Sequence, residues 1–114
     1  MSGILLGPAL LFCPADRPER YGKAADRADT VILDLEDAVA PGAKDGAREA
    51  LASTQLAPER TVVRLNAVGT SDFALDCEAV RRTDYRAVML AKRSEERFSR
   101  NAETGRISRM PSSA

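Results

Sequence analysis

Histidine is absent from the 114-residue sequence, and cysteine occurs only as Cys13 and Cys77. Without histidine the chain cannot form a Ser-His-Asp triad, a Cys-His dyad or a histidine-ligated zinc site. The two cysteines lie far apart in sequence and form neither a CxxC pair nor a disulfide framework, so a reducing cytoplasm is the simplest compartment. Acid–base chemistry would therefore depend on carboxylates, lysine or tyrosine.

The sequence also lacks an excess of charge of either sign, since 17 basic residues balance 17 acidic ones. No overall field favours nucleic acid or an anionic membrane surface as a partner. Residues 4–13 are fairly apolar, but Gly7 and Pro8 interrupt them, so we expect neither a signal peptide nor a membrane span. A complete eight-fold α/β barrel needs roughly 250 residues, which excludes one for this chain.

Short aliphatic runs predict four strands. They occupy residues 9–13, 30–33, 61–65 and 87–90, and their composition is typical of strands buried on both faces. The stretches between them have helical spacing. Because strands that alternate with helices pair in parallel through right-handed crossovers, we expect a β-α-β-α-β-α-β order and a parallel sheet covered by helices on at least one side.

Three helices are predicted between these strands. The first is capped by Asp16 and carries an apolar face at positions 21, 24, 25 and 28. The second begins after the Pro-Gly pair at positions 41 and 42 and ends before Pro58. The third begins near Ser71, which is a suitable N-cap.

Residues 93–114 interrupt this alternation, because arginines and serines dominate there and large apolar side chains are few. Such a segment buries too little surface to offset its ordering entropy, so we expect most of it to be disordered. The sequence therefore predicts an α/β domain at residues 1–92 followed by an irregular tail at residues 93–114.

Three carboxylates, those of Asp34, Glu36 and Asp37, follow the second predicted strand. In parallel α/β proteins ligands bind at this end of the sheet. Carboxylates so close together raise each other's pKa unless a cation or a donor compensates them. Two interpretations remain open: a site that meets a metal, its coordinated waters or a basic partner, or an acidic loop in solvent.

The third predicted strand delivers Arg64 and Asn66 to the same end of the sheet. With period-two alternation both side chains point the same way, and the planar guanidinium can hold a carboxylate or thioester oxygen. A basic residue inside an aliphatic run costs stability unless it is paired, which favours a functional role. The alternative is an internal salt bridge from Arg64 to Asp34 or Glu36.

Arg17 and Lys92 are further candidates for substrate contacts. Arg17 lies where the first strand leads into the first helix, and backbone N–H groups at a helix start can receive an anion. Lys92 follows the fourth strand and can face the same rim. The alternative for both residues is an exposed surface position.

Three segments occur in a characteristic order and at characteristic intervals: residues 11–20 (LFCPADRPER), 31–39 (VILDLEDAV) and 61–66 (TVVRLN). Residues 88–92 (VMLAK) are a weaker fourth match. Together they resemble the citrate lyase β-subunit-like branch of the HpcH/HpaI aldolase superfamily. The resemblance implies the N-terminal half of a (β/α)₈ TIM barrel, with about four parallel strands and three helices, in a protein that is usually a homo-oligomer.

The resemblance also implies an activity, namely a Mg²⁺-dependent carbon–carbon lyase that acts on a 3-hydroxyacyl-CoA or a related dicarboxylate. By this resemblance Arg64 would contact the substrate. Glu36 and Asp37 would lie beside the metal and its waters, and Asp34 is a further candidate for a position in the outer shell of the metal. The direct Mg²⁺ ligands lie on later strands of the family's barrel, and no position here matches them.

The resemblance stops near residue 92, and the following segment looks like a truncated or frame-altered end. A second hypothesis is therefore a catalytically silent fragment, a small α/β module that self-associates because an open parallel sheet has an unpaired edge. A third is a phosphoacceptor receiver domain, which has similar length and alternation. That fold requires an acceptor aspartate at the end of the third strand, where this chain has Arg64.

Overall fold

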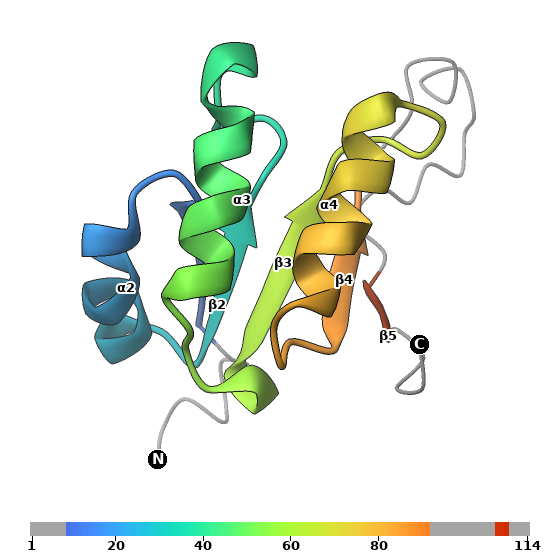
Figure 1. Cartoon of the computed structure of the whole chain (residues 1–114). Coiled ribbons are helices and arrows are strands. Elements are labelled where there is room, and N and C mark those ends of the chain that lie inside the picture. The colour runs from blue at the N-terminus through green and yellow to red at the C-terminus, as the bar shows by residue number, and fades with distance from the viewer. Residues whose placement is uncertain (1–8, 92–106, 110–114) are drawn as a thin grey trace.

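The computed structural model describes residues 9–91 and 107–109, which form one five-stranded sheet with helices (Figure 1). The strand order is β1-β2-β3-β4-β5. The first four strands pair in parallel, and the last pairs antiparallel with β4. Their bounds are β1 Leu10–Pro14, β2 Thr30–Asp34, β3 Thr61–Leu65, β4 Ala87–Leu90 and β5 Ile107–Arg109. The four predicted strands and their parallel order are confirmed.

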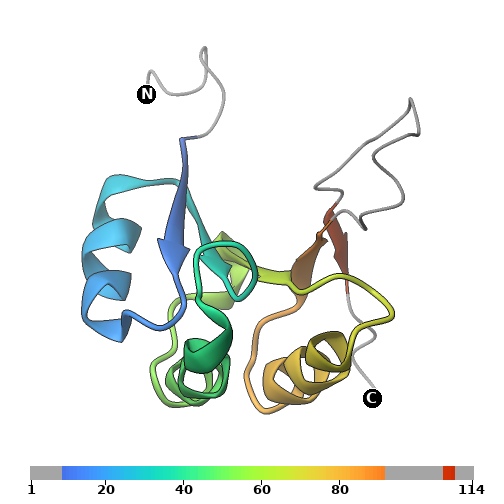
Figure 2. The ribbon, with the colours of Figure 1, turned by 90° about the horizontal axis from the view of Figure 1, so that it is seen from above.

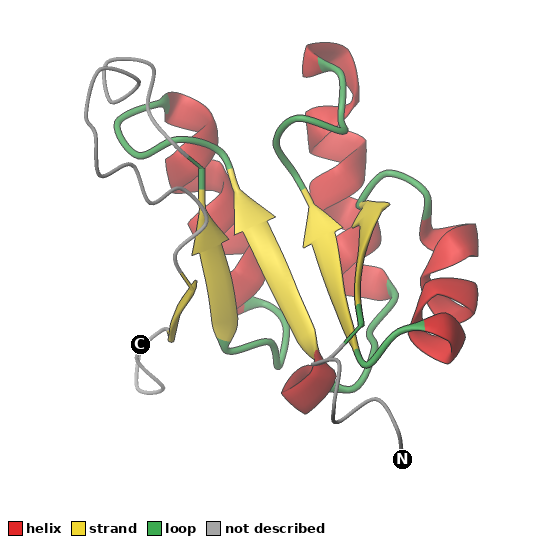
Figure 3. Cartoon of the chain, turned by 180° about the vertical axis from the view of Figure 1, so that it is seen from behind, coloured by secondary structure: helices red, strands yellow, loops and turns green. Residues whose placement is uncertain are grey.

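Three α-helices connect the parallel strands: α2 Tyr21–Arg27, α3 Lys44–Ser53 and α4 Ser71–Arg81. Short 3₁₀ turns that begin with proline precede α2, α3 and β3, at Pro18–Arg20, Pro41–Ala43 and Pro58–Arg60. All three helices lie on one side of the sheet, and the view from behind shows the strands in front of them (Figures 2 and 3). Within the described residues no helix is long and apolar enough to cross a membrane.

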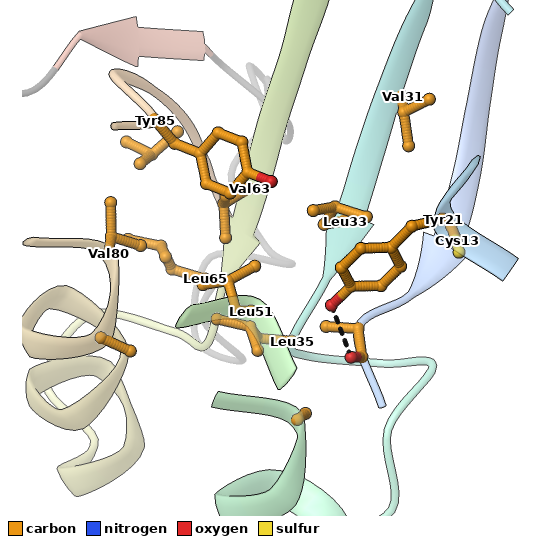
Figure 4. Close-up of a cluster of buried hydrophobic side chains, with 14 of the residues drawn as sticks. Cys13, Tyr21, Val31, Leu33, Leu35, Leu51, Val63, Leu65, Val80 and Tyr85 are labelled. Atoms are coloured by element: carbon orange, nitrogen blue, oxygen red, sulfur yellow. Dashed lines mark hydrogen bonds between the residues drawn. The ribbon is translucent and has the colours of Figure 1, made fainter. Parts of the chain in front are cut away.

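The main core lies between the sheet and the helices (Figure 4). Alternate residues of the strands point into it, such as Leu33 and Val63, and Leu51 and Val80 meet them from the helices. Alternation in the strands and 3.6-residue spacing in the helices thus place apolar side chains on facing surfaces. The hydroxyl of buried Tyr21 donates a 2.7 Å hydrogen bond to the Ala15 carbonyl, so its polar end is satisfied.

The opposite face of the sheet carries a smaller buried cluster of Ile32, Val62 and Met89. For β2 and β3 the prediction of burial on both faces is therefore confirmed. It is wrong for β1, where Leu10 is 56% exposed and Phe12 is 50% exposed. β1 is an edge strand with one neighbour, and no described helix covers the face on which Phe12 lies.

Two predicted helix caps are wrong by one residue. Residue 17, and not Asp16, precedes the first helical turn, and no side chain caps that turn. Thr70, and not Ser71, caps α4, because its hydroxyl accepts a 3.1 Å hydrogen bond from the Phe73 amide. Thr70 and Ser71 both satisfy the sequence rule for an N-cap, so the pattern alone does not choose between them. Arg17 does not satisfy that rule, and the first turn begins without a side-chain cap.

Residues 107–109 form β5, a short antiparallel strand that extends the sheet, within the segment that was expected to be mostly disordered. Local composition gave no sign of this strand, since its pairing with β4 joins residues about 20 positions apart. The rest of the predicted tail lies outside the described residues.

Candidate functional site

Asp34 and Arg64 lie side by side at the carboxyl ends of β2 and β3. The parallel register places their Cα atoms opposite one another. The guanidinium donates two hydrogen bonds to the carboxylate, from Nε to Oδ1 at 3.0 Å and from Nη2 to Oδ2 at 2.7 Å. The acidic segment (residues 34–37) and Arg64 thus meet at one rim of the sheet, as predicted, and the salt bridge that was the alternative interpretation is present.

Asp34 has no free acceptor position on this rim. Besides the two bonds from Arg64, its Oδ1 accepts the Glu36 amide at 2.8 Å and its Oδ2 accepts the Ala38 amide at 3.3 Å. The side chain is only 2% exposed. Charge-assisted bonds from four donors hold the carboxylate in the protein, so Asp34 positions its neighbours and does not face a ligand.

Glu36 and Asp37 are the carboxylates that reach solvent. The Glu36 side chain is half-buried, with Oε1 3.7 Å from Nη2 of Arg64, and Asp37 is exposed. At 3.7 Å the Glu36 contact is an ion pair without hydrogen-bond geometry. The Glu36 carboxylate is therefore close enough to attract the Arg64 guanidinium, while its oxygens remain available to water or a ligand.

Arg64 uses only one edge of its guanidinium on Asp34. Its Nη1 makes no hydrogen bond within the described residues, and the side chain is 23% exposed. The hydrogen bonds that Arg64 donates to Asp34 are the main reason that the pKa of Arg64 is raised above its ordinary value, which keeps the group charged. The Phe12 ring lies under the guanidinium, 5.1 Å from its carbon to the ring centroid, a favourable cation–π distance.

Asn66 does not lie beside Arg64. Its amide Nδ2 donates to the Leu35 carbonyl at 3.0 Å and to Oδ2 of Asp76 at 2.7 Å, and the residue is buried. β3 ends at Leu65, so strand alternation no longer holds at position 66, and the side chain turns toward α4. The expectation that Arg64 and Asn66 point the same way is wrong for this reason.

Two buried cations on α3, Lys44 and Arg48, lie near the carboxyl ends of the strands, and the sequence did not predict them. The Lys44 ammonium donates to the Leu35 and Glu36 carbonyls, both at 2.9 Å. Arg48 donates from Nη1 to Asp76 at 2.7 Å and from Nη2 to Asp45 at 2.8 Å. The spacing of these cations, i and i+4 on the buried side of α3, was the available signal.

The remaining predicted contacts lie elsewhere. Arg17 is exposed on the turn after β1, and Lys92 lies outside the described residues. A groove of about 340 Å³ lies between β1 and the helical segment that follows it, with the basic residues Arg20, Lys23 and Arg27 and the acidic residue Glu19 along the helical side. This groove was not predicted.

The described residues do not fit a complete metal site. No group of three or more acidic, histidine or cysteine side chains that could hold an ion occurs among them. The two Asp34 oxygens are engaged by backbone amides and Arg64, which leaves Glu36 and Asp37. Mg²⁺ keeps several waters and is held by one or two carboxylates together with other oxygen ligands, so Glu36 and Asp37 suit the surroundings of the ion but do not by themselves complete a site.

Comparison with known sequences gives a consistent result. The family described as HpcH/HpaI aldolase/citrate lyase matches residues 9–103, which extends past residue 92. A citrate lyase subunit beta-like protein of Mycobacterium tuberculosis is 64% identical over 86 residues, which are 75% of this chain and 32% of that protein. The citrate lyase subunit beta of Leuconostoc mesenteroides subsp. cremoris is 31% identical over 97 residues, with 81% of this chain and 32% of that protein covered.

Solved structures agree with this comparison. Protein CitE from M. tuberculosis in complex with magnesium, acetoacetate and coenzyme A is 63% identical, with a TM-score of 0.75, and the match covers 76% of this chain and 33% of that one. The M. tuberculosis citrate lyase beta subunit complexed with oxaloacetate and magnesium has the same identity and TM-score, with 76% and 39% covered. The chain spans about a third of the length of its curated relatives.

Proposed function

Because the chain belongs to the HpcH/HpaI aldolase/citrate lyase family, we propose that it carries part of the active site of a carbon–carbon lyase. The proposed substrate is an acyl-CoA ester or a related dicarboxylate. Relatives that have been solved with magnesium also hold coenzyme A with acetoacetate, or oxaloacetate, which supports this substrate class.

One observation carries the proposal: Arg64 is held on one edge by Asp34 and is open on the other. A carboxylate or thioester oxygen can accept from Nη1 and Nη2 without displacing Asp34. The salt bridge and a substrate contact are therefore compatible, and Asp34 orients the group that binds. Cleavage next to a carbonyl leaves an electron pair that becomes an enolate, and a guanidinium fixed beside that oxygen stabilises the developing charge.

Glu36 and Asp37 would handle water or a proton at the same rim, because their oxygens stay accessible beside Arg64. When bound, Mg²⁺ supplies Lewis-acid polarisation of a substrate oxygen. Its direct ligands would come from outside the described residues, so the roles of Arg64, Glu36 and Asp37 are argued without it. Arg17 and Asn66 have no contact that supports a substrate role, because Arg17 is exposed on the turn after β1 and Asn66 bonds to Leu35 and Asp76. Lys92 lies outside the described residues and stays a candidate for a substrate contact.

The basic groove beside β1 supports an anionic substrate. Arg20, Lys23 and Arg27 line it together with one acidic residue, Glu19. A groove with three cations can receive a phosphate-bearing group, which an acyl-CoA ester has and a short dicarboxylate lacks.

The test compares the 114-residue chain with a chimera in which the rest of the M. tuberculosis relative continues after residue 91. We expect the chimera to cleave an acyl-CoA ester with Mg²⁺. Arg64→Lys should lower its kcat/KM by roughly a hundredfold, because lysine lacks the planar fork that binds Asp34 on one edge and presents two aligned donors to the substrate on the other. Arg82→Lys, at the exposed arginine that directly follows α4, is the matched control.

Two results would contradict the proposal: a chimera that binds Mg²⁺ but cleaves no acyl-CoA, or one whose activity is unchanged by Arg64→Lys. If the chimera is active and the 114-residue chain is not, the activity belongs to the longer protein. Calorimetric titration of both chains with Mg²⁺ shows whether the ligands lie beyond residue 91.

A second candidate is the catalytically silent module that self-associates. The exposure of Leu10 and Phe12 on the edge strand β1 favours it, because apolar side chains on an unpaired edge promote pairing with another chain. The two candidates are compatible, since a chain that lacks part of the site can still associate.

A further inference from the structure

The peptide unit between Leu35 and Glu36 is fixed at both ends. Its carbonyl, from Leu35, accepts the Lys44 ammonium at 2.9 Å and the Asn66 amide at 3.0 Å. Its N–H, from Glu36, donates to Oδ1 of Asp34 at 2.8 Å. Because a peptide unit is planar, whatever holds the carbonyl also aims the N–H. Lys44 therefore acts on the carboxylate that orients Arg64.

The next peptide unit is held at its carbonyl. The Glu36 carbonyl accepts a second 2.9 Å bond from the Lys44 ammonium and a longer 3.3 Å bond from the Val39 amide. The Leu35 amide donates to the Arg64 carbonyl at 2.9 Å. One ammonium thus fixes two successive peptides of the acidic segment, directly beside the backbone of Arg64.

Helix α3 gains nothing from a lysine at this position. Lys44 is the first residue of α3, where a positive charge opposes the helix dipole. The residue is only 9% exposed, and among the described side chains no carboxylate pairs with its ammonium. Burial of an ammonium costs stability unless its bonds repay it, and the bonds that it makes are to the acidic segment. A lysine in the first turn of a helix is locally unfavourable, and here it is explained by its bonds to the acidic segment.

We propose that Lys44 is a positioning residue of the Arg64 site: it fixes the acidic segment so that Asp34 stays on one edge of Arg64 and leaves the other edge open. This inference rests on the proposed function, because a positioning role matters only if Arg64 binds substrate. Its test measures the geometry of the acidic segment and not the reaction, so the positioning role and the proposed function can each fail without the other.

The test is amide hydrogen exchange of the full chain, followed by NMR, in the unaltered protein and in Lys44→Met. Methionine keeps the apolar stem and removes the ammonium. A general loss of stability speeds exchange of all core amides by one common factor. We expect the Glu36 and Ala38 amides to accelerate by at least about tenfold beyond the factor shared by the Leu33 and Val63 amides.

A spectroscopic signature accompanies this change. The Arg64 Nε–H resonance should shift in Lys44→Met, because its bond to Asp34 weakens when the acidic segment moves. Lys23→Met, at an exposed lysine on α2, should change neither the exchange pattern nor this resonance. Lys44→Arg, which keeps a charged donor, should restore part of the protection of Glu36.

A uniform acceleration in Lys44→Met with an unmoved Arg64 resonance would overturn the proposal. If Lys44→Met does not fold, the unaltered protein decides the matter. The ammonium protons of Lys44, held between two carbonyls, should then exchange with water far more slowly than those of exposed Lys23. Equal rates for the two lysines would refute the proposal.

Discussion

Two arginine–aspartate pairs in this molecule show how the same residue types serve different ends. Arg48 is enclosed, and its guanidinium bonds to carboxylates on α3 and α4, including Asp76, which is fully buried. Arg64 bonds to Asp34 with one edge and presents the other to solvent. The free edge, and not the presence of an ion pair, distinguishes a candidate for binding from a residue that joins two helices.

The enclosed pair gives the first stability prediction. Asp76→Ala should lower the free energy of unfolding by about 3–5 kcal/mol, because it leaves the Arg48 guanidinium buried without its nearest carboxylate and removes the acceptor of two Asn66 donors. Urea unfolding followed by circular dichroism measures the change. A loss of this size is a large part of a typical total of about 5–15 kcal/mol.

Asp72→Ala is the matched control for this prediction. Asp72 lies on the same helix and faces the same guanidinium, but at 3.4 Å and with its side chain 39% exposed. Solvent screens such a contact, so its removal should cost no more than about 1 kcal/mol. Equal losses in the two variants would mean that burial does not decide the strength of this network.

At the scale of secondary structure, the sequence predicted the strands well because their signal is local. Four short aliphatic runs became β1 to β4, with bounds within one residue of those expected. The meeting of Asp34 and Arg64 followed from the same logic, since parallel strands place their carboxyl ends at one rim. Topology alone was enough to bring these two residues together.

What the sequence did not predict depends on contacts between distant segments. Lys44 and Arg48 have the composition of a solvated helix face, and only the carbonyls of the acidic segment and the Asp76 carboxylate make their burial tolerable. The turn of Asn66 toward α4 depends on where β3 ends. β5 pairs across a long separation in sequence and has no periodic pattern of its own.

The choice of N-cap for α4 is testable at this scale. Thr70→Ala should lower the free energy of unfolding by about 1 kcal/mol, because the Phe73 amide loses its side-chain acceptor and keeps only the Thr70 carbonyl at 3.2 Å. Ser71→Ala should change it by only a few tenths, since Ser71 is exposed in the first helical turn and makes no cap bond. Urea midpoints of the two variants give the answer, and the reverse order would restore Ser71 as the cap.

At the scale of the whole molecule, the two edges of the sheet differ. Within the described strands both β1 and β5 have one neighbour, but β1 has five residues and β5 has only three. A longer apolar strand with unpaired backbone groups is a template for a second chain, whereas a very short edge strand is a poor one. Pairing of β1 with β1 of a second copy gives a closed pair of chains, while pairing through both edges would give an open-ended assembly.

Self-association through β1 is therefore expected to stop at a dimer. Light scattering coupled to size-exclusion chromatography should give twice the chain mass of 12.3 kDa. Leu10→Lys places a charge on the exposed edge and should give a monomer, because the ammonium would be buried against the partner strand. Leu75→Lys, at a comparably exposed leucine of α4, should leave the dimer intact. A monomeric unaltered chain would remove the β1 edge as an interface, and larger assemblies that persist in Leu10→Lys would assign association to another surface.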